Sequence, residues 1–491
     1  MSRKIKTGLI PILIAAVLPL GANAAAPALT VVISVDQMRG DYMARFAKDF
    51  TGGFGRLARE GAVYTRARHG SVPTETSPGH AALMTGCFPS QHGIVGNEWW
   101  DKKEGRAIYA VEDPERWRGP VNLECPTLGD ALKAASPSSR VLSISGKDRA
   151  AILMGGRKAD LALWYDKGAG QFITSGAYGR MPDWVWNWDN DLRIPVPERE
   201  KISSTPRYDA MTLELALKAI DEERLGARGV PDLLAISLSA TDIIGHASGP
   251  DSPQMREQLL ALDKSLGAFL DGLDRRFGRD GYALALSADH GVTPLPEVSR
   301  AAGALRVDRD KLERELESAL RAKFGAPAKA GANWVLDLHS PYVYLDLAAA
   351  DAVKPGAAAP LLAEAADWLS RHAAVAFVYS AADLAGDAEG PYAEVFRRSY
   401  RPGRSGDLMI LFKRGVVISD GPTGTVHGLP YDDDARVPLI FLGAGIKPGL
   451  REEKVLATDL APTLARLLGV ELAPRAPSRV LVEALSAPPK S

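Results

Sequence analysis

Cysteine is scarce in this chain, with only Cys87 and Cys125 among 491 residues. Two thiols are too few for a cysteine-rich zinc module or for the dense disulfide framework of a small secreted domain. Their separation in sequence does not show whether they approach closely enough to pair, so a disulfide and two free thiols both stay open. Neither lies in a context that indicates a catalytic thiol, and we therefore look for chemistry among other side chains.

An excess of charge of either sign is also missing. The chain has 59 Lys and Arg residues against 60 Asp and Glu residues, for a formal net charge of -1. A protein that binds nucleic acid non-specifically needs a basic face, so this balance argues against nucleic-acid binding. Hydrophobic residues make up 46% of the chain, which is enough to build the large core of a soluble enzyme.

Long apolar runs are absent except near the N-terminus. There, three basic residues precede the apolar stretch from Gly8 to Leu20, and Ala22-Asn23-Ala24 fits a small-x-small cleavage site. The stretch is short for a membrane span. We therefore expect residues 1–24 to be a signal peptide, with an uncleaved anchor as the alternative, and residues 25–491 to form a catalytic domain in the periplasm or outside the cell.

Short apolar runs alternate with helical patterns along the rest of the chain. This alternation predicts an α/β fold whose central, mostly parallel sheet is flanked by helices on both faces. Two long stretches, about 97–205 and 293–420, are expected to be insertions that form cap-like walls over the active edge. We expect strands at 29–35, 140–144, 233–238, 282–288, 408–412 and 437–442, and helices at 208–224, 255–277 and 309–324.

Acidic and histidine side chains follow three of these expected strands. Asp36 comes directly after the first run, and Asp289-His290 come after the fourth. Asp242 and His246 follow the run at 233–238, and their i, i+4 spacing puts both on one face of a helical turn. Because parallel sheets bind ligands at the carboxyl ends of their strands, we expect these side chains to meet at one edge.

A further candidate is Thr76, in a segment that turns from a loop into a helix with Pro78 in the first turn. Free backbone N–H groups at a helix start favour a phosphate or a sulfate. Thr76 can then act as a nucleophile if a divalent metal lowers the pKa of its hydroxyl. The alternative, that Thr76 simply caps the helix, is the commonest role of such a residue.

The motifs taken together resemble the alkaline phosphatase superfamily. The resemblance is closest to the phosphodiesterase/nucleotide pyrophosphatase clan and, within it, to the threonine-dependent, phosphate-irrepressible bacterial alkaline phosphatases. It spans nearly the whole mature chain. The matching segments are Val35-Asp36-Gln37-Met38-Arg39-Gly40-Asp41-Tyr42, Pro73-Thr74-Glu75-Thr76-Ser77-Pro78-Gly79-His80, Thr241-Asp242-Ile243-Ile244-Gly245-His246, Ser287-Ala288-Asp289-His290-Gly291, Gly424-Thr425-Val426-His427-Gly428 and Thr458-Asp459-Leu460-Ala461-Pro462-Thr463-Leu464.

This resemblance implies two Zn²⁺ ions and a covalent phosphothreonine at Thr76. One zinc would be held by Asp242, His246 and His427, and the other by Asp36, Asp289, His290 and the Thr76 oxygen. Three imidazoles and three carboxylates suit zinc and argue against a pure calcium or magnesium site, while manganese and iron stay open. The implied enzyme is an exported alkaline phosphatase, expected to be a monomer that acts on small phosphate monoesters.

The resemblance also extends to residues that bind no metal. Asn97, Lys147 and Arg149 match the asparagine and Lys-x-Arg elements that clamp the phosphoryl group in the threonine-type phosphatases, which favours a monoesterase. On their own, Lys147 and Arg149 would more often be a solvated pair. A phosphodiesterase or nucleotide pyrophosphatase using the same two metals is the alternative function.

A sulfatase and a non-catalytic zinc-binding protein fit the sequence less well. The segment Cys87-Phe88-Pro89-Ser90-Gln91 superficially resembles a sulfatase signature but has Gln91 where that signature has arginine. An exported zinc-binding protein with a relic site would not need an intact nucleophile and ligand set. Both functions are therefore disfavoured.

Several further polar residues are expected to take no direct part in the chemistry. The run Asp432-Asp433-Asp434 lacks the glycine and glutamate spacing of a calcium-binding loop, so it is expected to be a solvated turn. The remaining histidines, His339 among them, are expected to be structural or to support the ligands.

Overall fold

The computed structural model describes residues 26–491, apart from 193, 300–302, 388, 420, 473–474, 476 and 487–491. The expected signal peptide, residues 1–24, lies outside this part. Within it, no helix has the length and apolar character needed to cross a membrane.

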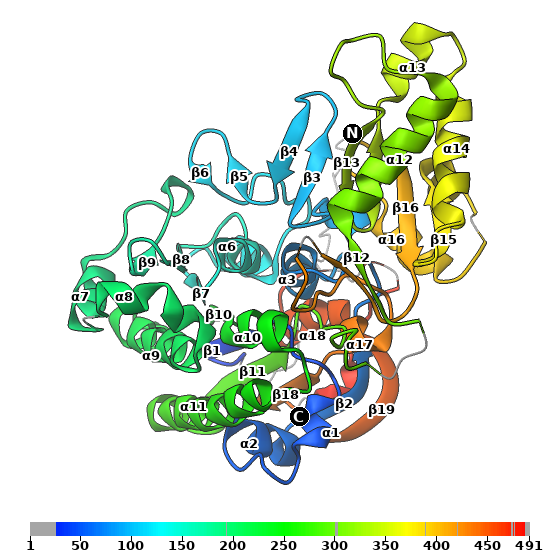
Figure 1. The fold of residues 1–491 in the computed structure, drawn as a ribbon. Coiled ribbons are helices and arrows are strands. Elements are labelled where there is room, and N and C mark those ends of the chain that lie inside the picture. The colour runs from blue at the N-terminus through cyan, green and yellow to red at the C-terminus, as the bar shows by residue number, and fades with distance from the viewer. Residues whose placement is uncertain are drawn as a thin grey trace, which may run out of the picture.

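A nine-stranded mixed sheet forms the centre of the molecule (Figure 1), in the order β19-β2-β18-β11-β1-β10-β7-β8-β9. The five strands β11, β1, β10, β7 and β8 run parallel to one another. Every residue of β1 is buried, as expected for a strand covered on both faces. The strands are β1 (Leu29–Val35), β2 (Ala62–Arg68), β7 (Val141–Ser145), β8 (Leu161–Asp166), β9 (Gln171–Ile173), β10 (Asp232–Leu238), β11 (Tyr282–Ser287), β18 (Leu439–Gly443) and β19 (Gly449–Leu456).

Two groups of helices cover this sheet on opposite sides (Figure 1). One group packs around α11 (Pro253–Phe277), which contacts α2 (Gly53–Glu60), α9 (Arg207–Glu222) and α10 (Ala240–Ser248). The other group packs around α3 (Thr76–Thr85) and comprises α5 (Leu128–Ala135), α6 (Asp148–Gly155) and α18 (Leu460–Leu468). The expected α/β fold with helices on both faces is therefore confirmed.

A buried carboxylate joins two helices of the first group. Asp263 on α11 accepts hydrogen bonds from the backbone N–H groups of Thr51 (2.9 Å), Gly52 (2.6 Å), Phe54 (2.7 Å) and Gly55 (3.3 Å). These are the donors that the start of α2 would otherwise leave unpaired. Asp263 thus caps α2 from a neighbouring helix.

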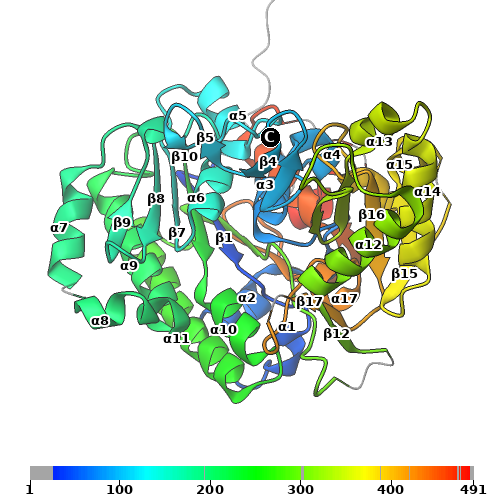
Figure 2. The same cartoon turned by 45° about the horizontal axis from the view of Figure 1, so that its top comes forward.

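The stretch expected as the second insertion forms a separate body beside the central sheet, seen at the right of Figure 2. Its antiparallel sheet has the order β13-β14-β16-β15, and β12 pairs with β17. The expected strand at 408–412 is β16 and belongs to this second sheet. Its elements are β12 (Leu305–Asp308), α12 (Arg309–Phe324), β13 (Val335–His339), β14 (Tyr342–Leu345), α13 (Leu347–Val353), α14 (Ala358–Ser370), β15 (Val375–Ser380), α15 (Ala381–Ala385), α16 (Ala393–Ser399), β16 (Leu408–Phe412) and β17 (Val416–Ser419).

The stretch expected as the first insertion, residues 97–205, lies partly inside the central sheet and partly outside it. Strands β7, β8 and β9 join the central sheet and α5 packs with the helices that cover it, so only parts of the flanking segments stand apart from the sheet. Those segments hold two small hairpins, β3 with β4 and β5 with β6, and a group of short helices. Their bounds are β3 (Glu98–Asp101), β4 (Arg106–Tyr109), β5 (Glu112–Asp113), β6 (Trp117–Arg118), α7 (Asp183–Leu192) and α8 (Val196–Arg199).

The expectation of a solvated turn at Asp432-Asp433-Asp434 is wrong. These residues start the short helix α17 (Asp432–Ala435), and Asp434 is fully buried. Its carboxylate accepts hydrogen bonds from the hydroxyl of Thr293 (2.8 Å) and the N–H of Leu429 (2.9 Å). Burial raises the pKa of Asp434 to about 7.

The two cysteines, Cys87 and Cys125, are both buried in the structure, and their thiols form no disulfide.

Candidate active site

The sheet order brings the expected metal ligands together. Strands β11, β1 and β10 are neighbours, and each is followed by ligand candidates at its carboxyl end. Asp36 follows β1, the pair Asp289-His290 follows β11, and α10, which begins just after β10, carries Asp242 and His246. His427 reaches the same place from the loop before α17.

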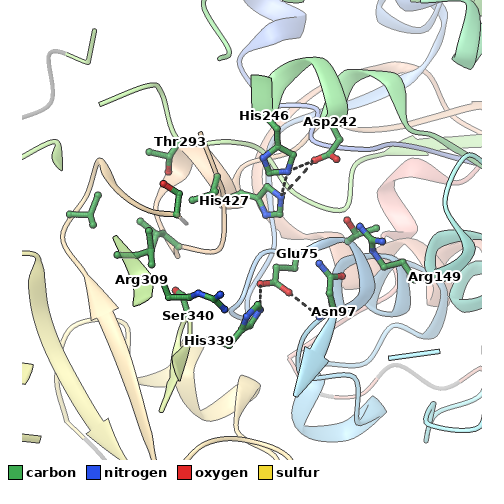
Figure 3. A pocket seen from close by; sticks show the side chains of 16 residues that line it. Glu75, Asn97, Arg149, Asp242, His246, Thr293, Arg309, His339, Ser340 and His427 are labelled. Atoms are coloured by element: carbon green, nitrogen blue, oxygen red, sulfur yellow. Dashed lines mark hydrogen bonds and ion pairs between the residues drawn. The ribbon is translucent and has the colours of Figure 1, made fainter. Parts of the chain in front are cut away.

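One compact group of candidate ligands is Asp242, His246 and His427, whose ligand atoms all lie within 4.8 Å of one another. Nε2 of His246 lies 3.1 Å from Oδ1 of Asp242 and 3.2 Å from Nε2 of His427. Figure 3 shows the three side chains pointing toward one another at one side of the pocket. This is the first ligand set that the sequence implies.

A second group comprises Asp36, Asp242 and His290. Nε2 of His290 lies 3.6 Å from Oδ1 of Asp36 and 3.3 Å from Oδ2 of Asp289. Asp289, the expected ligand, uses its other oxygen to accept the N–H of Gln37 (3.1 Å) and of His290 (3.0 Å). Asp242 thus lies between the two groups.

Each histidine of the site is oriented by a backbone carbonyl. Nδ1 of His246 lies 2.7 Å from the oxygen of Thr425, and Nδ1 of His427 lies 2.7 Å from the oxygen of Thr74. Nδ1 of His290 lies 2.8 Å from the oxygen of Gly291. Because a carbonyl only accepts, Nδ1 carries the proton in each ring, which leaves the Nε2 lone pair for a metal.

The buried polar atoms fit metal binding. Among the described residues, Oδ1 of Asp36, Oδ2 of Asp289 and Nε2 of His290 are buried without a hydrogen-bond partner. Burial lowers the pKa of His290 and of His427 well below the ordinary value, and neighbouring imidazoles add to this at His427. Imidazoles and carboxylates at this spacing are the donors that zinc and similar transition metals prefer.

Two cations lie beside the ligands, at the start of α6. Nζ of Lys147 lies 2.5 Å from Oδ2 of Asp36 and 2.6 Å from Oδ2 of Asp242. Burial acts to lower the pKa of Lys147, but Asp242 and Asp36 outweigh it and raise the pKa above its ordinary value. Arg149 donates to the hydroxyl of Tyr109 at 3.4 Å. Both cations therefore stay charged beside the site.

Thr76 is the first residue of α3 and is buried. Nδ1 of His80, one turn later, donates to the carbonyl of Thr76 (2.8 Å), and Nε2 of His80 meets the hydroxyl of Ser237 on β10 (2.9 Å). Gly79 lets the helix approach β11, since a Cβ there would collide with the carbonyl oxygen of Asp289. The start of α3 is thus held against the ends of two strands.

A cavity of about 310 Å³ opens over Thr76. One side carries Asn97 and Arg149, and the metal-ligand group lies at another (Figure 3). The wall from the second insertion includes Arg309, His339, Ser340, Val416, Ile418 and Ser419. Of the expected site residues, Thr76, Asn97, Arg149, Asp242, His246 and His427 line this cavity, while Asp36, Lys147, Asp289 and His290 do not.

Sequence reasoning missed several residues of this cavity, and two of them are in contact with each other. Glu75 directly precedes Thr76, and its carboxylate accepts the N–H of Asn97 at 2.9 Å. His339, which the sequence assigned no active role, lies 3.7 Å from the other oxygen of Glu75. The position of Glu75 next to Thr76 was the one signal available, whereas nothing in the sequence points to His339.

Comparison with known proteins agrees with this arrangement. Residues 30–433 match the family model of type I phosphodiesterases and nucleotide pyrophosphatases. The chain is 34% identical to the alkaline phosphatase PhoK of Sphingomonas sp., over 90% of this chain and 88% of that protein. It is 30% identical to the alkaline phosphatase PafA of Elizabethkingia meningoseptica, over 94% of both chains.

Solved structures of alkaline phosphatases and related proteins share the fold of this chain. The crystal structure of wild-type alkaline phosphatase PafA superimposes with a TM-score of 0.87 and 29% identity, covering 94% of this chain and 99% of that one. A second structure is a variant of PafA in which a threonine, an asparagine, a lysine and an arginine are replaced. Murine ectonucleotide pyrophosphatase/phosphodiesterase 5 shares the fold, with a TM-score of 0.60 at 16% identity.

Proposed function

Since the chain belongs to the phosphodiesterase/nucleotide pyrophosphatase family of the alkaline phosphatase superfamily, we propose that it is a metal-dependent alkaline phosphatase. It hydrolyses phosphate monoesters through a covalent intermediate on Thr76. The observation that carries this proposal is one cavity that combines Thr76 at a helix start, the Asp242, His246 and His427 group, and the cation of Arg149. The named alkaline phosphatases that match over most of the chain support it.

The proposed cofactor is a pair of zinc ions. One would be held by Asp242, His246 and His427, and the other by Asp36, Asp289, His290 and the Thr76 oxygen. Bound there, the ions would lower the pKa of the Thr76 hydroxyl and stabilise the charge of the leaving oxygen.

The side chains of this protein supply binding and orientation. Asn97 accepts the N–H of Ser77 through Oδ1 (2.9 Å), which leaves its amide N–H groups to donate to a phosphate oxygen. Arg149 and Lys147 would hold the other non-bridging oxygens with charge-assisted hydrogen bonds. These cations stabilise a bound monoester dianion more than a diester monoanion, so Lys147 and Arg149 favour the binding of monoesters.

The reaction then has two displacements at phosphorus. The hydroxyl of Thr76 gives its proton to water and its oxygen forms a bond to phosphorus as the bond to the leaving alcohol breaks; water returns one proton to the departing alcohol. A water oxygen next attacks phosphorus, the bond to Thr76 breaks, and Thr76 recovers its proton. The products are the alcohol and inorganic phosphate.

The N-terminal pattern of residues 1–24 supports export to the periplasm or the exterior. Small monoesters outside the cytoplasm would then be the substrates of a monomeric enzyme.

The proposal is tested by replacing Thr76 with Ala. Turnover of p-nitrophenyl phosphate should fall by at least about 10³-fold, because the nucleophile is lost. The matched control is Thr85→Ala, at the other end of α3, which should keep most of the activity. Near-normal turnover by Thr76→Ala would refute the assignment.

The same assay decides between ester classes in the wild-type enzyme. A monoesterase turns over p-nitrophenyl phosphate with a higher kcat/KM than bis-p-nitrophenyl phosphate or p-nitrophenyl sulfate. The family name leaves a phosphodiesterase as the second candidate, and the opposite order of the two phosphate esters would establish it.

A further inference from the structure

A second hollow, of about 590 Å³, adjoins the cavity over Thr76 and is lined by the start of α6 and the end of β8. Arg149, Asp242 and His246 line both spaces, whereas Thr76 lines only the first. A ligand bound over Thr76 can therefore extend into the second hollow. We call this hollow the Trp117 groove, and its lining also includes Lys147, Trp164, Tyr165, Lys167 and Tyr208.

Trp117 places a large aromatic ring at the surface of this groove. The residue is 54% exposed, and its backbone φ of 70° lies in the left-handed region, which is unfavourable for a bulky side chain. The buried indole of Trp164 packs beside it, with ring centroids 6.1 Å apart and ring planes at 42°. An exposed ring on strained backbone, supported by a buried ring, indicates contact with a ligand rather than core packing.

The hairpin that carries Trp117 is tied to the start of α6. The guanidinium of Arg118 lies over the indole of Trp117, 4.9 Å from the ring centroid. Nε of Arg118 donates to Oδ2 of Asp148 at 2.9 Å. Asp148 stands in the sequence between the two cations of the proposed phosphate clamp. These contacts therefore hold the ring of Trp117 at a fixed place relative to the clamp.

The geometry of phosphoryl transfer sets the direction of the leaving group. The attacking and the leaving oxygen lie on opposite sides of phosphorus, so the leaving oxygen points away from Thr76. Arg149, which would hold the phosphoryl group, lines the cavity over Thr76 and also the Trp117 groove. The organic part of the ester is thereby directed toward the groove and its aromatic wall.

We propose that the Trp117 groove binds the leaving group of the substrate and that Trp117 selects phosphate monoesters of aromatic alcohols. This inference rests on the proposed phosphatase function and names a substrate class for it. A flat ring can stack on the exposed indole or meet it edge to face, and both arrangements stabilise aromatic pairs beyond the burial of apolar area. A short alkyl group or a polyol does not gain this contact.

The experiment compares the wild-type protein, Trp117→Ala and Trp117→Phe on 2-naphthyl phosphate, glycerol 2-phosphate and glucose 1-phosphate. Each variant is compared with wild type on the same substrate, so the different reactivities of the leaving groups cancel. Trp117→Ala should lower kcat/KM for 2-naphthyl phosphate about 10-fold and that for the other two esters less than about 2-fold. Trp117→Phe, which keeps an aromatic ring, should retain most of the preference.

The matched control is Trp186→Ala, on α7 in the same insertion, because Trp186 is 50% exposed and lies outside the groove. It should leave all three substrates unchanged. A second comparison is Ile418→Ala, in the wall that the inserted body adds to the cavity over Thr76, which should affect aromatic and alkyl esters alike. Equal losses on all three esters in Trp117→Ala, or an aromatic-selective loss in Ile418→Ala instead, would overturn the proposal.

A measurement without turnover separates this inference from the proposed function. Benzylphosphonate, in which a CH2 group replaces the bridging oxygen of an ester, should bind to the zinc-loaded protein about 5- to 10-fold more tightly than cyclohexylmethylphosphonate in calorimetry. Trp117→Ala should remove this difference. An active monoesterase that binds both phosphonates equally would overturn the inference. A Trp117-dependent preference without any monoester turnover would refute the phosphatase and leave the aromatic site standing.

Discussion

The ion pair between His339 and Glu75 should make stability depend on pH in a defined way. The perturbation is His339→Gln, which keeps a side chain of similar length but removes the titrating ring. The groups that face His339 are Glu75 from the start of α3, Glu98 from β3 and Asp337 from its own strand. All three are acidic, so they favour the imidazolium in the folded protein.

The magnitude follows from the pKa of His339, which rises from 6.5 to about 9 on folding. A group whose pKa is higher in the folded state adds stability that is fully present below its unfolded pKa. That stability is lost as the pH rises through the folded pKa. Because a pKa difference of one corresponds to about 1.4 kcal/mol, the contribution is about 3 kcal/mol at pH 6 and close to zero above about pH 9 to 10.

The assay is scanning calorimetry of the zinc-loaded wild-type and variant proteins from pH 6 to pH 10. For a chain of this length, about 3 kcal/mol corresponds to a difference in Tm of about 3 °C. The wild-type advantage should be largest at pH 6 and should vanish near pH 10. An advantage that stays constant over this range, or grows with pH, would refute the reasoning, because it would mean that His339 is neutral in the folded protein.

Two further predictions concern the fold and the metal centre. Asp263→Asn removes the charge from an acceptor of four backbone N–H groups, so it should cost about 2 to 3 kcal/mol of stability and lower the Tm by a few degrees. Its kcat at 25 °C should not change, and Asp271→Asn, exposed on the same helix, should alter neither quantity. Prolonged chelation should abolish phosphatase activity and lower the Tm, because ligands that bind only the folded state stabilise it. Added zinc should restore both, and full activity with no metal detectable by elemental analysis would contradict the proposed centre.

The central sheet was predictable because its signal is local. The run from Leu29 to Val35 is apolar at almost every position, and β1 occupies the same residues, buried on both faces. Parallel strands of this kind leave a continuous hydrophobic run that needs no knowledge of neighbours. The helix at 309–324 was equally local, since its amphipathic pattern matches the bounds of α12.

Features that depend on distant partners were not predictable. Three successive aspartates are strongly polar and therefore predict a solvated position for Asp434, yet the hydroxyl of Thr293 satisfies its carboxylate from 141 residues away. The pairing of His339 with Glu75 joins two separate bodies of the structure in the same way. Asp242 lies between the two ligand groups, and sequence spacing cannot give that placement.

The arrangement of the site separates two kinds of residue. Ligand candidates such as Asp36 and Asp289 follow strands of the central sheet directly, so their positions are fixed by the strand register that also forms the core. Asn97 and His339, in contrast, lie on segments that leave that sheet, one just before β3 and the other at the end of β13. A shift of either segment can therefore move Asn97 or His339 while the candidate metal ligands stay in place. The contact between Nε2 of His339 and Oε1 of Glu75, at 3.7 Å, is where the inserted body meets the residue that precedes α3.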